Sequence, residues 1–171
     1  MNDYASVKSA HIESLPCIGC YNGNEDVFVY YQKSTLYGCL EFNGKHYAYE
    51  CNFLPGYITN YASVPKKLQW FLPSYVMDDP VYNSFAALHD WLYSVKGDIG
   101  NGIVFSRSVC DDIFRSGLRE SSSLKSKNHP RIMAGIANVG LRLFAGGKAH
   151  WGNDSYNCKR YCTFSLTELP K

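Results

Sequence analysis

The chain has 171 residues, of which 46% are hydrophobic and 19% are charged. A chain of this length can bury a core as a single domain, and its net charge of +2 is too small to indicate a nucleic-acid-binding protein. No N-terminal run is typical of a signal peptide, and no uncharged stretch reaches transmembrane length. We therefore expect a protein that is made in a cytosol and does not bind nucleic acid.

The first part of the chain is predicted to contain the strands. Residues 1–25 are rich in turn-forming residues and are predicted to be irregular. Residues 26–32 contain a run of β-branched and aromatic residues, which predicts a strand. This strand and the hairpin that follows it form a β-hairpin region at 26–53.

The clearest local pattern is Asn43-Gly44 between two alternating runs, which is typical of a type I′ hairpin turn. Pairing Phe42 with Lys45 sets the register of the two strands. Because Glu41 then lies opposite His46, we interpret His46 as a cross-strand charge partner and not as a catalytic residue.

Helices are predicted after this hairpin. Residues 54–80 form a proline-punctuated connector, and three helices are predicted at 81–95, 107–119 and 130–145, with Ser106 as the N-cap of the second. The fold class that follows is α+β, an antiparallel hairpin or meander followed by three helices, two of them packed antiparallel. The single domain 1–171 would then consist of the irregular segment 1–25, the hairpin region 26–53, the connector 54–80, a helical site region 81–147 and a C-terminal tail 148–171.

Polar groups border the apolar faces of the first two predicted helices. His89 lies at the edge of one apolar arc, with Tyr93 one turn later, and Asp90 points further round to a wetter side. On the next helix Asp111 borders the apolar arc, whereas Asp112 points the opposite way and is predicted to be solvated.

An aspartate at an apolar border needs a partner. His89 is the natural partner of Asp111 if the two helices pack antiparallel, and the alternative is an i,i+4 pair with Arg107. A histidine can take a proton from water near neutral pH, and a carboxylate can orient its imidazole, so this pair is a candidate catalytic site. The other interpretation of His89 is a boundary histidine that hydrogen-bonds a backbone carbonyl or a tyrosine.

The sequence has seven cysteines, and an odd number without a secretory signal argues against a disulfide framework. Cys17 and Cys20 have the spacing of a zinc knuckle, and Cys158 and Cys162 could supply two further ligands. One Zn²⁺ joining both ends of the chain is therefore one hypothesis. The alternative is four reduced or pairwise oxidised thiols in the terminal segments.

Several strings in order resemble one known family. They are Pro55-Gly56-Tyr57-Ile58-Thr59-Asn60-Tyr61-Ala62-Ser63-Val64-Pro65, Trp70-Phe71-Leu72-Pro73, His89-Asp90-Trp91-Leu92-Tyr93, and Ser106-Arg107 with Cys110-Asp111 and Phe114. They resemble the phage- and prophage-encoded family catalogued as domain of unknown function 1353, and this chain departs from that pattern at Asn60, where the family usually has Asp. The resemblance implies a protein made in the bacterial host cytoplasm and incorporated in the virion, with other virion proteins as partners.

The string from His89 to Tyr93, with Asp111 on a facing helix, is more distantly similar to the phospholipase A2 superfamily. That resemblance implies that His89 activates water, Asp90 ligates Ca²⁺, Asp111 orients His89 and Tyr93 supports the pair by hydrogen bonding. Asp78, Asp79 and Asn60 are further residues that could supply oxygen ligands to calcium. The glycine-rich calcium loop and the cysteine bridges of the superfamily have no counterpart in this sequence.

These resemblances lead us to expect a virion-associated protein of the phage tail or neck. Its site would hydrolyse lipid esters of the host membrane with Ca²⁺ during host entry. The alternative is a non-enzymatic structural or accessory phage protein with a vestigial site. An HD-type phosphohydrolase is disfavoured, because such domains need further histidines on helices and His11 and His46 lie in a predicted loop and strand.

Overall fold

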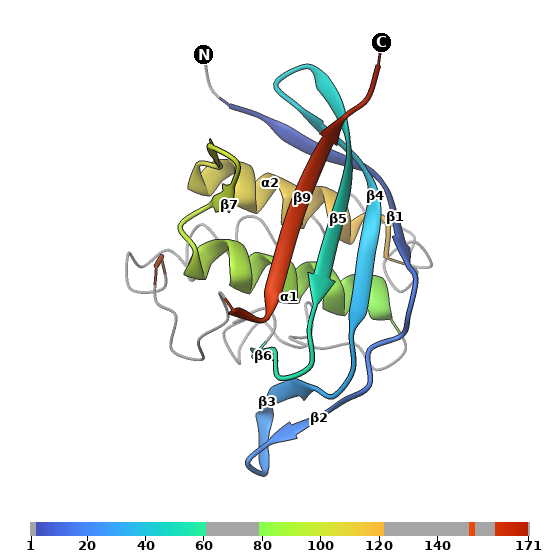
Figure 1. Ribbon diagram of the computed structural model, residues 1–171, viewed down its shortest axis with the longest axis vertical. Helices are drawn as coiled ribbons and strands as arrows, with labels where there is room; N and C mark the ends of the chain where they lie inside the picture. Colours follow the sequence, from blue (N-terminus) through green and yellow to red (C-terminus); the bar gives the residue numbers. More distant parts are fainter. Residues whose placement is uncertain (1–2, 61–78, 122–150, 153–159, 171) are drawn as a thin grey trace.

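The computed structural model describes residues 3–60, 79–121, 151–152 and 160–170. Within these ranges the chain forms nine strands and two helices (Figure 1). In chain order they are β1 (Ala5–Ile12), β2 (Ile18–Tyr21), β3 (Asn24–Tyr30), β4 (Ser34–Phe42), β5 (Lys45–Phe53), β6 (Ile58–Thr59), α1 (Pro80–Ser94), β7 (Asp98–Gly100), β8 (Ile103–Val104), α2 (Arg107–Leu118) and β9 (Cys162–Glu168). The largest sheet has the strand order β1-β4-β5-β9, and smaller sheets are formed by β2-β3-β6 and by β7-β8.

The predicted fold class of one hairpin region followed by three helices is wrong. Strands predominate in the described residues, and in the sequence they occur before, between and after the two helices. The segment 1–25, predicted to be irregular, contains β1 and β2, and the tail 148–171 contains β9. The third predicted helix, at 130–145, lies outside the described residues.

The hairpin predicted from Asn43-Gly44 is confirmed. Phe42 pairs with Lys45 and Glu41 pairs with His46 across β4 and β5. Asn43 and Gly44 have φ angles of 49° and 77°, and a type I′ turn requires positive φ at both central positions.

The two outer strands of the large sheet come from opposite ends of the chain. β1 pairs with β4 and β9 pairs with β5, both antiparallel. β9 alternates buried Cys162 and Phe164 with the exposed Thr163 and Ser165, which is the pattern of a strand with one face on the core. β1 carries less of this signal, since only Ala5 and Val7 of its eight residues are buried.

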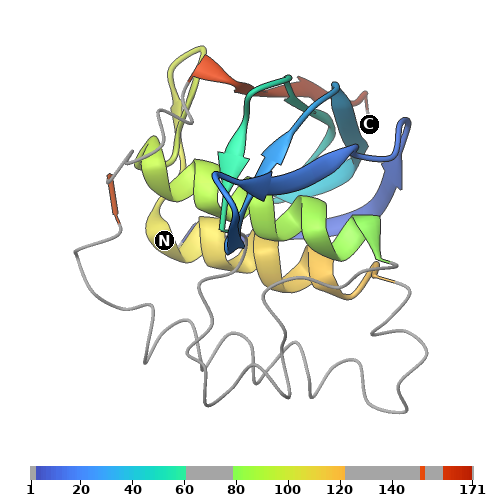
Figure 2. The same cartoon turned by 90° about the horizontal axis from the view of Figure 1, so that it is seen from below.

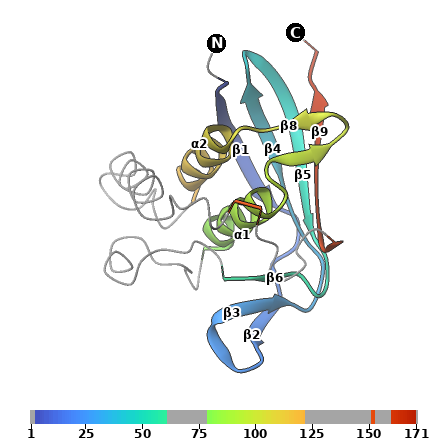
Figure 3. The same ribbon diagram turned by 90° about the vertical axis from the view of Figure 1, so that its left-hand side faces the viewer.

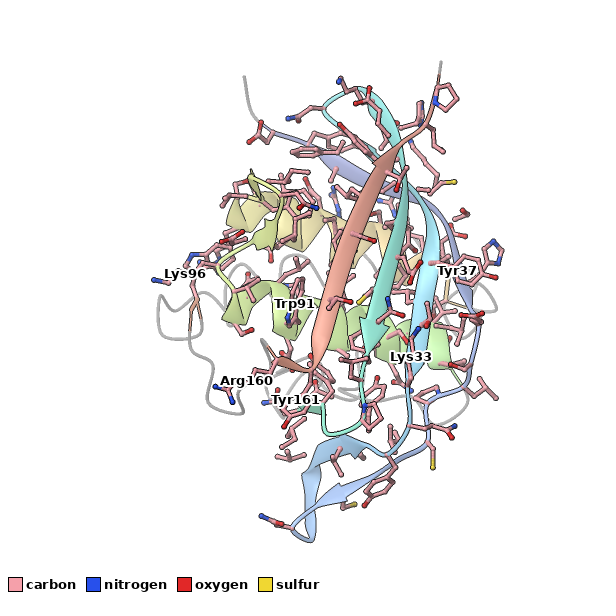
Figure 4. All side chains as sticks on the ribbon, in the orientation of Figure 1. Lys33, Tyr37, Trp91, Lys96, Arg160 and Tyr161 are labelled. Atoms are coloured by element: carbon pink, nitrogen blue, oxygen red, sulfur yellow. The ribbon has the colours of Figure 1, made fainter. Side chains whose placement is uncertain are left out.

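Both helices cover the same face of this sheet (Figure 3). Aromatic rings pack between the helices and the sheet. Phe85 of α1 lies 6.5 Å from Tyr49 of β5, and Trp91 of α1, labelled in Figure 4, lies 6.5 Å from Phe164 of β9 between the ring centroids. The backbone N–H of Val7 also donates to Ser116 Oγ on α2 at 2.8 Å, so that β1 is tied directly to the second helix.

The helices lie side by side and run antiparallel (Figure 2). At one end Asp79, the N-cap of α1, accepts a hydrogen bond from the Ser121 hydroxyl just after α2, at 2.6 Å. One turn further along, Gly117 of α2 faces Phe85 so closely that a Cβ at position 117 would lie 2.3 Å from the Phe85 ring. Neither described helix combines the length and the apolar character needed to cross a membrane.

Gly117→Ala should therefore push α1 and α2 apart. The added methyl group overfills the contact with Phe85, and overpacking of this kind costs about 1–3 kcal/mol of unfolding free energy. The gain in helix propensity from Gly to Ala, about 1 kcal/mol, offsets only part of that cost. We expect a lower denaturation midpoint in urea, with Ser108→Ala on the exposed side of α2 close to the wild type. Equal or greater stability of Gly117→Ala would contradict this packing.

Candidate functional site

The site is formed where the C-terminal half of α1 faces the N-terminal half of α2. His89 Nε2 lies 3.0 Å from Asp111 Oδ1, and the Tyr93 hydroxyl donates to the same oxygen at 2.6 Å. His89 and Asp111 are only 4% and 3% exposed. The contact predicted between His89 and Asp111 is confirmed, and Tyr93 joins it from the next turn of α1.

The protonation of this cluster follows from its hydrogen bonds. Burial opposes ionisation of Asp111, but the hydrogen bonds and charges of His89, Tyr93 and Arg107 together lower the pKa of this carboxyl. An ionised carboxylate can only accept hydrogen bonds, so His89 Nε2 must carry the hydrogen. In the neutral imidazole the lone pair is then on Nδ1, and no described residue forms a hydrogen bond with that nitrogen.

Arg107 takes a different place from the i,i+4 pair considered as an alternative. Its Nε donates to the Tyr93 hydroxyl at 3.0 Å, and its guanidinium carbon lies 5.7 Å from the centre of the Tyr93 ring. Tyr93 therefore accepts from Arg107 and donates to Asp111. Burial and the hydrogen bond to Asp111 raise the pKa of Tyr93, which keeps the hydroxyl protonated as a donor.

Aromatic rings hold the imidazole in place. The His89 ring lies 4.2 Å from the Tyr93 ring and 4.9 Å from the Phe114 ring between centroids. Trp151 packs edge-on against Tyr93 at 5.0 Å, and the backbone of Gly152 donates to the Tyr93 carbonyl at 2.8 Å. The imidazole thus has a fixed orientation with an apolar floor, which a general base in a dry site requires.

The second carboxylate, Asp90, belongs to a separate contact. It accepts a hydrogen bond from the Thr59 hydroxyl at 2.7 Å and another from the backbone N–H of Asn60. Burial raises the pKa of Asp90 to about 7, although both hydrogen bonds act in the opposite direction. The Tyr57 hydroxyl also donates to the carbonyl of Ala87 on α1 at 2.7 Å, so two contacts fasten the β6 segment along this helix.

Within the described residues, Asp90 is met by hydrogen-bond donors. Calcium takes six to eight oxygen ligands, whereas Thr59 and the backbone of Asn60 both donate hydrogen bonds to this carboxylate. Asn60 reaches Asp90 through its backbone N–H, and Asp79 is engaged at the start of α1 by Ser121 and the backbone N–H of Tyr82. In the parts of the chain that the structure describes, no three His, Cys, Asp or Glu side chains gather as a metal site.

Three of the four predicted zinc ligands lie within the described residues, and there Cys162 is not grouped with Cys17 and Cys20. Cys17 and Cys20 are exposed, whereas Cys162 is buried on β9 beside Cys51. These three thiols form no metal-binding group, and Cys158 lies outside the described residues.

Two features of the site differ from the sequence prediction. Asp112, predicted to be solvated, is 8% exposed and pairs with Arg115 at 2.8 Å. Thr59 was not predicted as a site residue. Its position within the family-like string that begins at Pro55 is the one signal that pointed to it.

The raised pKa of Asp90 predicts a specific pH dependence of stability. The pKa moves from 3.8 to about 7, so the folded protein holds more protons than the unfolded chain from about pH 4 to about pH 7. The unfolding free energy should fall across that window as pH rises, by up to about 4 kcal/mol from this group. Asp90→Asn should remove this decline. In urea denaturation, the unfolding free energy of the variant should therefore rise relative to that of the wild type between pH 5 and pH 8.

Glu13→Gln is the matched control, because Glu13 is an exposed acid and its replacement should leave the wild-type pH profile unchanged. Identical slopes for the wild type and Asp90→Asn would show that Asp90 is ionised in the folded protein throughout this range.

Comparison with known proteins identifies the family. The model of the family described as "Protein of unknown function (DUF1353)" matches residues 40–134, more than half of the chain, and this range contains His89, Asp90, Tyr93, Arg107 and Asp111. No curated protein and no solved structure matches the chain. The chain belongs to the DUF1353 family.

Proposed function

We propose that this protein is a hydrolase in which His89 is the general base. The observation that carries the proposal is the hydrogen bond of 3.0 Å between His89 Nε2 and Asp111 Oδ1, reinforced by Tyr93. An ionised carboxylate bound to one nitrogen of an imidazole sets the tautomer and fixes the direction in which the lone pair of the other nitrogen points. The same arrangement of roles occurs in histidine-based hydrolytic sites on unrelated folds.

The reaction can be written with this chain's own groups. Nδ1 of His89 takes a proton from a water molecule as the water oxygen attacks a carbonyl carbon. The imidazolium that forms is stabilised by the carboxylate of Asp111, which remains ionised because Tyr93 also donates to it. The proton on Nδ1 is then delivered to the leaving oxygen, which restores the neutral base.

Lipid esters are the substrate class that we propose. The His89-Asp90-x-x-Tyr93 string and the facing Asp111 resemble phospholipase A2, and the order of groups from Tyr93 to Asp111 to His89 supports the roles implied by that resemblance. The proposal differs from the resemblance at Asp90, whose donors Thr59 and Asn60 hold the β6 segment and leave no role for Ca²⁺ in the proposed reaction.

A second candidate is a non-enzymatic protein in which the same network stabilises the fold. The low exposure of His89 and Asp111, 4% and 3%, favours this alternative, because a general base must be reached by water. The two functions are distinguishable. A purely structural network loses stability when it is broken, but it gives the wild type no esterase activity to lose.

The place of action is a further proposal that rests on the resemblance to phage-encoded proteins. We place the protein in the tail or neck of a virion, where contacts with other virion proteins and with the host membrane would occur during entry. Mass spectrometry of purified particles should find it at a constant ratio to a tail protein. Its absence from particles, together with its presence in infected cells, would refute this placement.

The hydrolase proposal predicts a graded loss of activity in the network. Phospholipid vesicles should release fatty acid with the wild type, and His89→Ala should lower the rate by about 10²-fold or more. Asp111→Asn should cause a loss of similar order because the tautomer is no longer held, and Tyr93→Phe a smaller one of roughly 10-fold. The readout is fatty acid measured by mass spectrometry, with circular dichroism confirming that each variant is folded.

His46→Ala is the matched control, since His46 is an exposed histidine on β5 opposite Glu41. The rate should also be unchanged by EDTA. Full activity of His89→Ala, or no hydrolysis by the wild type with or without Ca²⁺, would refute the hydrolase. Activity that needs Ca²⁺ and is lost in Asp90→Asn would instead restore the role of Asp90 as a metal ligand.

A further inference from the structure

Two buried thiols face each other across the edge of the large sheet. Cys51 of β5 and Cys162 of β9 are 0% and 2% exposed, and their sulfur atoms lie 3.6 Å apart. Neither cysteine takes part in a disulfide in this structure. A separation of 3.6 Å is van der Waals contact between sulfur atoms, so no other side chain lies between them.

The strand register explains why they meet. Cys51 pairs with Phe164 and Phe53 pairs with Cys162, so each cysteine is two residues from the other's partner. Residues two apart on a strand share a face, and diagonal neighbours on antiparallel strands are within reach of each other. The contact is therefore set by the pairing of β5 with β9 and does not depend on a flexible loop.

We propose that Cys51 and Cys162 form a disulfide under oxidising conditions and thereby fasten β9 to the sheet. A disulfide bond is about 2.05 Å long, so the sulfur atoms must approach by about 1.5 Å. Cys162 is the first residue of β9, and β9 is an edge strand bonded only to β5 in this sheet, so its backbone can shift toward β5 at this end. Tyr161, labelled in Figure 4, marks this end of the strand.

The oxidant that the proposal requires is a hydroperoxide. One thiolate attacks the peroxide oxygen, which gives a sulfenic acid and releases water or an alcohol. The second thiol attacks the sulfenic sulfur, the S–S bond forms, and the sulfenic oxygen leaves as water. Two thiols and one hydrogen peroxide thus give one disulfide and two water molecules. Because both thiols are buried, the first step proceeds when the end of β9 opens transiently, as edge elements do.

The crosslink would enclose the whole candidate site. Residues 52–161 lie between the two cysteines, and they include β6, α1 and α2 with His89 and Asp111. Closing a loop of this length restricts the unfolded chain strongly and stabilises the folded state. This inference does not depend on the proposed hydrolase.

The other cysteines provide internal controls. Cys110 is buried on α2 with no second thiol recorded in contact with it among the described residues, and Cys39 lies on β4 opposite Ala48, on the other face of the sheet from Cys51. Cys17 and Cys20 are exposed and close in sequence, so they can pair with each other. A background with Ser at positions 17, 20, 39 and 158 retains only Cys51, Cys110 and Cys162.

The test is oxidation of that background protein in its folded state with hydrogen peroxide, followed by alkylation and peptide mapping. We expect a crosslinked peptide that joins Cys51 to Cys162 and is lighter by two hydrogens than the reduced pair, with Cys110 alkylated. The thermal midpoint should rise on the order of 10 °C on oxidation and return with dithiothreitol. Cys51→Ala and Cys162→Ala should each abolish the shift, whereas Cys110→Ala should retain it.

Recovery of both Cys51 and Cys162 as alkylated thiols would overturn the proposal, and so would a crosslink from either of them to Cys110. Oxidation of Cys51 or Cys162 to sulfinic acid without a crosslink would also overturn it, because the second thiol would then not have reached the first. A crosslink that forms only after denaturation in urea would have the same meaning.

Discussion

The carboxylate of Asp111 lies between two helices and accepts hydrogen bonds from His89 and Tyr93, both on the opposite helix. A buried charge without partners is costly, so this carboxylate favours the register of α1 and α2 in which both donors reach it. The rest of the helix pair agrees with that register. Phe85 faces Gly117, where a larger side chain would not fit. Asp79, the N-cap of α1, accepts a hydrogen bond from Ser121, just after the end of α2.

Two acids flank His89 in the structure, and their pKa values move in opposite directions. Asp111 is partnered by His89 and by Tyr93, which in turn is bound to Arg107, and this positive surrounding outweighs burial and lowers its pKa. Burial outweighs the hydrogen bonds that Asp90 accepts from the neutral donors Thr59 and the backbone of Asn60, and it raises the pKa of Asp90. The same residue type is therefore a fixed anion at one position and a group that exchanges a proton near neutrality at the other.

The small sheet β2-β3-β6 contributes to the site by placing the β6 segment along α1. β3 pairs with β6, the Tyr57 hydroxyl reaches the Ala87 carbonyl, and Thr59 reaches Asp90 three residues further along the same helix. The fold thus supports His89 from two sides. α2 supports it directly through Asp111, and β6 supports it through Asp90, the residue that follows His89 in the chain. A histidine held in this way is as rigid as a structural residue, and its tautomer is the one that a general base needs. Because the same hydrogen bonds serve both roles, activity and stability must be measured separately.

The local features of this chain were determined by sequence alone. The turn at Asn43-Gly44 and the extents of α1 and α2 follow from turn chemistry and helical periodicity. For Asp111 the sequence left two partners open, His89 and Arg107, and the packing of α1 against α2 decided for His89. Tertiary structure decided the outer strands β1 and β9, the donors at Asp90 and the contact of Cys51 with Cys162. These contacts join residues far apart in the chain, and neither an edge strand nor a single hydroxyl has a local sequence pattern that identifies its distant partner.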